Sequence, residues 1–416
     1  MTSQTFPTDH TTATVRSRRK RLPLPGLACM ALTAVVLSTA APALAAPAAS
    51  PAAVVAASKP DLPKLNAAAL QAAVEGSSVS ATAMLARVSG PAGQWTGTSG
   101  VADVTTGEAV PADGRFRLGS VTKMFIGTVV LQLAAEDQVE LDRPVQEYLP
   151  GVLPAEYPPI SVRQLLDYTS GLPELTAGDL PTDPQGIVDH RFDDHTFGEL
   201  VAMAVKHPRL FDRPGSMQSY GATGYYVAAL LVEKLTGRSY QREITDRILL
   251  PLNLRHTTAP ETDTTIPGPH AHGYIDLSPA HDKTGLVDIT EQNPGAGGMI
   301  STGADLDRFL TALFRGRLLP PPQLDEMFTV PNVPYLGGSD QDPGHGRAFY
   351  GAGPMRVTFP NGVTVRGKTG STFGYTDGMF ATRDLKRRLV YSFNPVTGGG
   401  NDRRIVNQII TAAFGS

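Results

Sequence analysis

The sequence predicts an α/β fold in which an antiparallel sheet is built from both ends of the chain. N- and C-terminal helices would flank the sheet, and a mostly helical region would be inserted. Segments rich in β-branched and aromatic residues occur at 79–103 and return at 362–395. Between about residues 142 and 300, strand patterns nearly vanish and apolar residues take helical spacing. A single sheet with the helices outside it is a compact solution for this order.

Individual elements follow from periodicity and from capping residues. The expected strands cover residues 79–90, 93–103, 362–370, 374–384 and 387–395. The expected helices cover residues 61–76, 161–171, 223–237 and 401–414. Ser161 and Thr223 stand where N-caps are expected, and Asp61 is a possible cap of the first helix. Gly76 and Gly237 stand where helices should end.

The N-terminal residues have the pattern of a secretory signal peptide over residues 1–45. A basic stretch precedes the apolar run GLACMALTAVVLSTA, and Ala43-Leu44-Ala45 offers a cleavage site. The pair Arg18-Arg19 leaves a twin-arginine export route open, and a retained anchor is the alternative. Residues 46–60 are rich in alanine and proline and predict a linker. We therefore expect a secreted, extracellular protein with no stable membrane insertion after cleavage.

Cysteine and charge content argue against several kinds of protein. The only cysteine, Cys29, lies in the predicted signal peptide, so the mature chain would have no disulfide and no thiolate ligand. Removing residues 1–45 leaves 31 basic and 38 acidic residues, a net charge of −7. An acidic exported protein is a poor candidate for binding nucleic acid or anionic membranes. We expect a monomer without a cofactor.

The segment FRLGSVTKMF, residues 116–125, holds Ser120 and Lys123 three residues apart. Positions i and i+3 share a helix face, so Lys123 would lie beside the Ser120 hydroxyl. A serine becomes a nucleophile when a base takes its proton, and burial and nearby positive charge can prepare a lysine for that role. The alternative is that Ser120 caps a helix and Lys123 is solvated. These residues alone favour the alternative.

A second segment, RGKTGSTFGY at residues 366–375, reverses this preference. It places Lys368-Thr369-Gly370 at the end of an expected strand. There a cation and a hydroxyl can face a cleft, and the glycine lets a substrate come close. By itself the triplet also fits an ordinary glycine-rich turn. Together with Ser120, Lys123 and a tyrosine in the helical region between them, it is a specific combination.

Five segments carry a resemblance to a known superfamily. They are FRLGSVTKMF, SVRQLLDYTSGL, IPGPHAHGY, GGMISTGADLDRFLTAL and GKTGSTFGY. From about residue 86 onward the chain resembles serine DD-peptidases and class C β-lactamases, and is most like secreted D-alanyl-D-alanine carboxypeptidases. The resemblance implies a β-lactamase/transpeptidase-like domain over residues 61–416. Its α/β part would cover about 61–117 and 290–416, and its helical part about 118–289.

The resemblance also implies catalytic roles. Ser120 would be the acylated nucleophile and Lys123 its partner. Tyr220, in RPGSMQSYGATGYY, would relay protons between Ser120 and the leaving amine. Two cations, Lys123 and Lys368, would push its phenol toward phenolate.

Further residues would bind the substrate. The resemblance implies that the backbone N–H groups of Ser120 and Ser371 form the oxyanion hole. Thr369 would help to bind the terminal carboxylate of the substrate. Arg366 shares a strand face with Lys368, and Arg356 stands next to the position of the family's arginine, so both are candidates for the same carboxylate.

One departure from the superfamily concerns substrate recognition. The family motif is Tyr-x-Asn, whereas this chain has Tyr220-Gly221-Ala222. The family asparagine binds the acyl-side amide of the substrate and helps to hold the lysine, and Ala222 can do neither.

Two histidine-containing segments are left out of the predicted site. His270-Ala271-His272 spaces two imidazoles as in a metal site, but no further ligands follow at suitable spacing, so no metal is expected. A polar segment between expected helices is interpreted as solvated surface; it contains His190, Asp193, Asp194 and His195.

The expected function is that of a secreted serine hydrolase that acts on D-alanyl-D-alanine peptides through an acyl-serine intermediate. Its substrate would be a small peptide, an ester or a β-lactam. The alternatives are an esterase or β-lactamase on the same scaffold, or a penicillin-binding or sensor protein that does not turn over.

Overall fold

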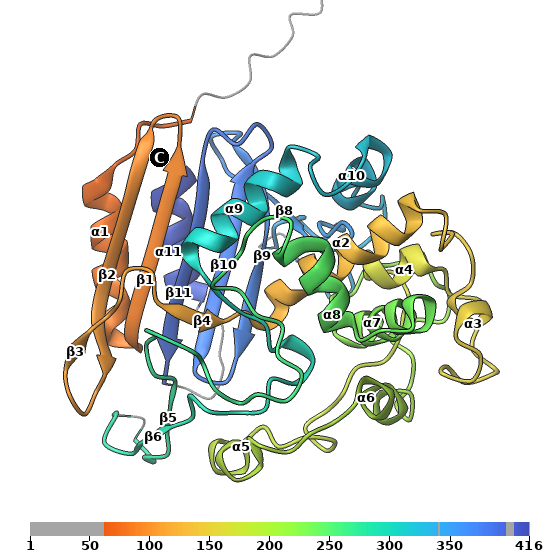
Figure 1. The fold of residues 1–416 in the computed structure, drawn as a ribbon, viewed down its shortest axis with the longest axis horizontal. Helices are drawn as coiled ribbons and strands as arrows, with labels where there is room; N and C mark the ends of the chain where they lie inside the picture. Colours follow the sequence, from red (N-terminus) through yellow and green to blue (C-terminus); the bar gives the residue numbers. More distant parts are fainter. Residues whose placement is uncertain (1–61, 281, 340–341, 397–402, 416) are drawn as a thin grey trace, which may run out of the picture. The chain divides into compact units, whose positions relative to one another are not determined.

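The computed structural model describes residues 62–280, 282–339, 342–396 and 403–415. The predicted signal peptide, the linker and Asp61 lie outside these residues. The centre of the described chain is an antiparallel sheet in the order β3-β2-β1-β11-β10-β9-β8 (Figure 1). Its strands are β1 (Ala81–Gly90), β2 (Gly93–Asp103), β3 (Glu108–Ala109), β8 (Met355–Thr358), β9 (Thr364–Thr372), β10 (Tyr375–Thr382) and β11 (Arg388–Pro395). Both ends of the chain therefore build one sheet, and the predicted fold class is confirmed.

Two small antiparallel pairs lie outside this sheet. They are β4 (Arg115–Arg117) with β7 (Ile300–Thr302), and β5 (Tyr274–Asp276) with β6 (Leu286–Asp288). The helices of the described residues are α1 (Ala67–Glu75), α2 (Thr122–Ala135), α3 (Val145–Tyr148), α4 (Val162–Leu166), α5 (Pro184–His190), α6 (Phe197–Ala204), α7 (Thr223–Thr236), α8 (Tyr240–Ile244), α9 (Gly303–Phe314), α10 (Pro321–Phe328) and α11 (Arg403–Phe414). None of the helices in the described ranges is both long and apolar enough to cross a membrane.

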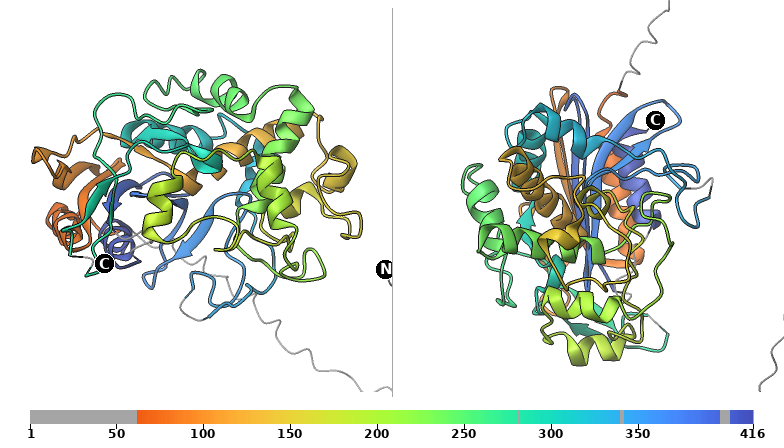
Figure 2. Two further views of the ribbon diagram at one scale, coloured as in Figure 1. Left: turned by 90° about the horizontal axis from the view of Figure 1, so that it is seen from below. Right: turned by 90° about the vertical axis from the view of Figure 1, so that its right-hand side faces the viewer.

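The sheet has helices on both faces because its strands bury side chains on both sides. In β1, Met84 lies in the apolar cluster formed with α1 and α11, and its neighbour Leu85 lies in the cluster that contains Phe309 of α9. Successive strand residues point to opposite faces, so one strand serves both clusters. Helices α2, α4, α7 and α8 gather beyond β9, apart from α1 and α11 (Figures 1 and 2).

The ends of the predicted helices are partly confirmed. The first helix begins at Ala67, because the Asn66 side chain accepts a hydrogen bond from the Ala69 N–H and so forms the N-cap. Ser161 caps α4 as predicted, although that helix already ends at Leu166. Gly237 ends α7 with a left-handed φ of 69°, the conformation that glycine adopts without strain.

Candidate active site

Ser120 lies in a tight turn between β4 and α2. The 3-10 turn Gly119–Val121 leads directly into α2, and the N-cap position is taken by Val121, which makes no side-chain cap hydrogen bond. Ser120 Oγ instead accepts a hydrogen bond from Lys123 Nζ at 3.1 Å and lies 2.7 Å from the hydroxyl of Tyr220. The serine is therefore engaged with two proton-carrying groups and does not act as a helix cap.

Helix α2 holds Ser120 and Lys123 in place because it is apolar almost all round. Met124, Phe125 and Ile126 are buried, and the ring of Phe125 stacks on Phe309 of α9 at 4.0 Å between centroids. A helix packed on every side has little freedom to shift, since protein interiors are close-packed.

Tyr220 lies between two lysines that come from distant parts of the chain. Lys368 Nζ is 4.4 Å from the centroid of the Tyr220 ring, and Lys123 Nζ is 5.6 Å from it. Lys368 is delivered by β9, is buried, and donates a hydrogen bond to the carbonyl oxygen of Thr369 at 3.0 Å. The structure thus brings together Ser120, Lys123, Tyr220 and Lys368, while their catalytic roles stay predictions.

The surrounding charges prepare Tyr220 to lose its proton. Burial alone would raise the pKa of the phenol. The positive charges of Lys123 and Lys368, with hydrogen bonds from Ser120 and Lys368, outweigh burial and lower the pKa of Tyr220 to about 7. The pKa of Lys368 is also lowered, first by burial and then by the charge of Lys123. The cluster can therefore exchange a proton near neutral pH, as a general base must.

Gly119, next to Ser120, packs directly against the backbone of Ser371, the other residue of the predicted oxyanion hole. Its φ is +46°, and a Cβ built on it would lie 2.6 Å from the backbone nitrogen of Ser371 and 2.4 Å from its carbonyl oxygen. Any side chain at this position would push Ser371 away from Ser120. This arrangement agrees with the predicted pairing of the Ser120 and Ser371 backbone N–H groups, which stays a prediction.

Gly119→Ala is expected to lower the free energy of unfolding by about 2–4 kcal/mol, because it adds both backbone strain and a clash. Gly107→Ala is the matched control: its φ is +71° but its Cβ would meet nothing within 4 Å, so only strain of about 1 kcal/mol is expected. Urea denaturation measures both variants. Equal losses for the two would mean that Gly119 does not form a tight contact with Ser371.

A carboxylate approaches the position where the family asparagine is missing. Glu174 accepts hydrogen bonds from the backbone N–H groups of Ala222 at 2.7 Å and Thr223 at 3.2 Å, so it caps α7. Burial raises the pKa of Glu174, while these N–H groups and the charge of Lys123 oppose the rise. No sequence pattern pointed to Glu174, because its partner residues lie 48 positions away.

Asp377 is a second carboxylate that sequence reasoning missed. It lies on β10 opposite Gly370 of β9 and is fully buried, and neither carboxylate oxygen has a partner among the described atoms. A Cβ at Gly370 would lie 2.2 Å from Asp377 Oδ1, so the glycine makes room for the carboxylate. Burial raises its pKa well above the usual value, and the charge of Lys368 opposes this. The β-branched and aromatic residues of this segment had predicted only an ordinary strand.

The two candidate arginines do not reach the site. Arg356 and Arg366 face each other across β8 and β9, and the guanidinium of Arg366 lies 5.6 Å from the ring of Phe328. Neither arginine lines the cavity that contains Ser120. Arg366 shares a strand face with Lys368, as predicted, but it lies two residues back along β9. This placement argues against the role in carboxylate binding that was predicted for both. Thr369 follows Lys368 on β9, and its predicted role in carboxylate binding stays a prediction.

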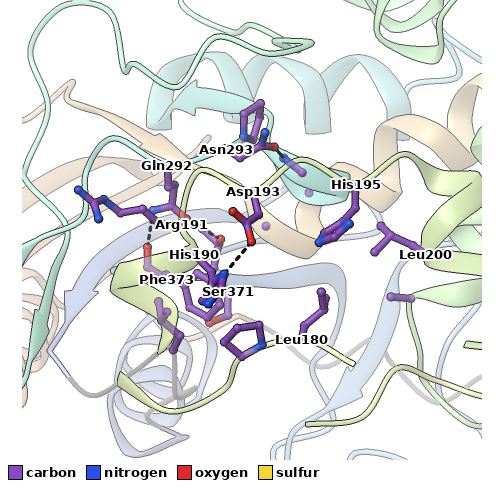
Figure 3. Close-up of a pocket in the computed structure, with 18 of the residues that line it drawn as sticks. Leu180, His190, Arg191, Asp193, His195, Leu200, Gln292, Asn293, Ser371 and Phe373 are labelled. Carbon is purple, nitrogen blue, oxygen red and sulfur yellow. Dashed lines mark hydrogen bonds and ion pairs between the residues drawn. The ribbon is translucent and has the colours of Figure 1, made fainter. Parts of the chain in front are cut away.

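A cavity of about 330 Å³ opens above Ser120 (Figure 3). Its described lining includes Ser120, Lys123, Ala222 and Ser371. A wall is contributed by residues 180–200, a segment that includes α5 and the first half of α6. Its lining residues are Leu180, Pro181, Ile187, His190, Arg191, Asp193, His195 and Leu200. The volume is at the small end of the range for ligand pockets, which suits a substrate of one or two amino-acid residues.

The polar segment is solvated, as interpreted from the sequence: His190, Asp193 and Asp194 are exposed. His190, Asp193 and His195 also line the same cavity as Ser120, and only Asp194 of the four is absent from the described lining. Sequence spacing could not show that this exposed segment borders the cavity. In the other histidine pair, His272 Nδ1 lies 2.6 Å from Asp288 Oδ2, and the described residues contain no group of three or more metal-ligating side chains.

Comparisons with known proteins agree with this geometry. The family described as Beta-lactamase matches residues 43–410. The chain is 32% identical to penicillin-binding protein 4 of Amycolatopsis lactamdurans over 217 residues, which cover 51% of this chain and 54% of that protein. The chain thus spans about half the length of this curated relative.

Two solved structures are similar over most of their length. The D-stereospecific amidohydrolase from a Streptomyces species has a TM-score of 0.72 and 35% identity, with 84% of this chain and 98% of that chain covered. The D-amino acid amidase from Ochrobactrum anthropi SV3 in complex with L-phenylalanine amide has a TM-score of 0.67 and 25% identity, with coverages of 83% and 97%. The resemblance predicted from the sequence is thereby confirmed. The chain belongs to the beta-lactamase family and has the serine β-lactamase and transpeptidase fold.

Proposed function

We propose that this protein hydrolyses amide bonds on the carbonyl side of D-configured residues through an acyl-enzyme on Ser120. The observation that carries the proposal is the contact of Ser120 Oγ with the Tyr220 hydroxyl at 2.7 Å, beneath a cavity and beside Lys123 and Lys368. Similarity to a D-stereospecific amidohydrolase over nearly all of that chain supports the choice of substrate.

The reaction follows from this cluster in two steps. The Tyr220 phenolate accepts the Ser120 proton while Oγ forms a bond to the substrate carbonyl carbon. The bond from that carbon to the amine nitrogen then breaks, and the proton passes to the leaving amine. A water molecule attacks the resulting ester by the reverse transfer and restores the serine. The N–H groups of Ser120 and Ser371 would stabilise the oxyanion in both steps.

The sequence-based expectation, a D-alanyl-D-alanine carboxypeptidase, is the second candidate. Similarity to a penicillin-binding protein favours it. The positions of Arg356 and Arg366 argue against a carboxypeptidase. Such an enzyme has to bind a terminal carboxylate, and neither arginine lines the cavity. An esterase or β-lactamase would use the same cluster, and a sensor would stop at the acyl-enzyme. We also propose that the protein acts outside the cytoplasm, as the pattern of its first 45 residues indicates.

The test is the hydrolysis of D- and L-phenylalaninamide and of an N-acylated peptide that ends in D-Ala-D-Ala, followed by product release. We expect kcat/KM for the D-amide to exceed that for the L-amide by at least about tenfold. Cleavage of the D-Ala-D-Ala peptide alone would favour the second candidate. If Ser120→Ala retains the activity, or no D-substrate is cleaved, the proposal is wrong.

A further inference from the structure

Glu174 is a partly buried carboxylate to which the proposed mechanism assigns no role. It lies between α4 and α5, and its side chain reaches the start of α7. Glu174 Oε2 accepts a hydrogen bond from the Ala222 N–H at 2.7 Å, and both carboxylate oxygens accept from the Thr223 N–H, at 3.2 and 3.3 Å. The carboxylate therefore holds the two residues that follow Tyr220 and Gly221.

The start of α7 depends on this carboxylate, because the helix has no capping side chain of its own. Ala222 occupies the N-cap position and makes no side-chain hydrogen bond. The first N–H groups of a helix have no partner within it, and the positive end of the helix dipole attracts an anion. In α1, by contrast, the N-cap residue Asn66 itself accepts from the Ala69 N–H at 3.0 Å. In α7 the acceptor comes from a residue 48 positions away.

Gly221 leaves room for the carboxylate. A Cβ built on Gly221 would lie 2.0 Å from Glu174 Oε1 and 2.4 Å from Glu174 Cδ, and its three nearest heavy atoms outside the chain neighbours all belong to Glu174. The φ of Gly221 is not in the left-handed region, so the backbone there does not require glycine. The close approach of Glu174 is therefore what excludes a side chain at residue 221.

The same turn carries Tyr220, whose hydroxyl lies 2.7 Å from Ser120 Oγ. Before the tyrosine, the Ser219 N–H donates to the Tyr168 carbonyl oxygen at 2.9 Å. After the tyrosine, the backbone N–H groups of the next residues but one donate to the Glu174 carboxylate. The backbone is thus fixed on both sides of Tyr220, and Glu174 supplies the second of the two anchors.

We propose that Glu174 is a positioning residue for the reaction: its carboxylate fixes the turn after Tyr220 and so keeps the phenol oxygen within reach of Ser120 Oγ. This inference rests on the proposed acyl-enzyme mechanism and names the group that places its proton acceptor. Glu174 is absent from the described lining of the cavity, so it acts through Tyr220 and not on the substrate. A displacement of about 1 Å in a reacting group can lower the rate by about a hundredfold.

The first experiment measures kcat and KM with D-phenylalaninamide or the D-Ala-D-Ala peptide, whichever the wild-type protein cleaves faster. Glu174→Ala should lower kcat by about 100-fold and leave KM within about threefold, since no contact with the substrate is lost. Glu174→Gln keeps one acceptor oxygen for the Ala222 N–H and should lose about tenfold or less. Asn66→Ala is the matched control: it removes the cap of α1, outside the described lining of the cavity, and should leave kcat/KM within about twofold.

Two double variants separate positioning from a general loss of structure. In Tyr220→Phe the phenol hydroxyl is already gone, so the addition of Glu174→Ala should cost less than about threefold more. Gly221→Ala alone should lower kcat as Glu174→Ala does, because its methyl group displaces the carboxylate. In Glu174→Ala that space is free, so the further addition of Gly221→Ala should cost less than about twofold.

The possible failures can be told apart. If Glu174→Ala keeps kcat/KM within about twofold of wild type, or costs as much in Tyr220→Phe as in wild type, the role of Glu174 is overturned and hydrolysis through Ser120 stands. If Glu174→Ala does not fold, Glu174→Gln and Gly221→Ala decide, and a wild-type kcat in both overturns the proposal. If the wild-type protein cleaves neither substrate in a Ser120-dependent manner, the proposed function fails and this inference fails with it.

Discussion

Ser120→Ala is expected to lower kcat/KM by at least about a thousandfold and to abolish covalent acylation. Without Oγ no ester can form, and the remaining cluster can only assist attack by water, which is far less effective. Lys123 and Tyr220 both make hydrogen bonds to Oγ itself, so the substitution also removes the group on which these two side chains converge. Steady-state kinetics with a D-amide measure the first effect.

Intact mass spectrometry measures the second effect after incubation with benzylpenicillin or a D-aminoacyl ester. Wild-type protein should gain one acyl group if the intermediate accumulates, and Ser120→Ala should gain none. Ser216→Ala is the control: its hydroxyl is bonded to the Arg213 carbonyl oxygen in a surface turn, outside the described lining of the cavity. Equal labelling of Ser120→Ala and wild type would place the nucleophile elsewhere.

Tyr220→Phe is expected to lower kcat/KM by about 100- to 10,000-fold, the usual contribution of general acid–base catalysis. The pKa of Tyr220 is lowered to about 7 in the folded protein, so the phenolate that accepts the Ser120 proton exists above this pH. Wild-type kcat/KM should therefore rise as the pH increases through about 7 and fall below it. This rise, the acid limb of the pH profile of kcat/KM, should be absent from the profile of Tyr220→Phe.

Two further variants sharpen the pH experiment. Lys368→Met removes one of the two charges that lower the pKa of Tyr220, so the limb should move to higher pH. Tyr168→Phe is the control, since its ring lies 5.0 Å from that of Tyr220 but its hydroxyl bonds to the Gly353 carbonyl oxygen, at 3.5 Å, and to Tyr225. A limb that stays near pH 7 in Tyr220→Phe would assign the titration to another group.

Most of the fold could be predicted because its determinants are local. The β-branched runs that became β1, β9, β10 and β11 and the cap at Ser161 act over a few residues, and the structure has them close to the predicted places. The predicted start of α1, residue 61, was wrong by several residues. The helix begins only after Asn66, whose side chain caps it. Secondary structure can be predicted from the sequence wherever residues close together in the chain determine it.

The sequence by itself determined the pair Ser120 and Lys123, since three residues on a helix turn bring them together wherever the helix lies. It also pointed to Tyr220 and Lys368, but only through resemblance to a family. Only the tertiary structure decided that Asp193 lines the same cavity as Ser120, that Glu174 caps α7 beside Ala222, and that the two arginines are absent from the described cavity lining. These contacts join segments far apart in the chain, and packing of the whole core sets which of them meet.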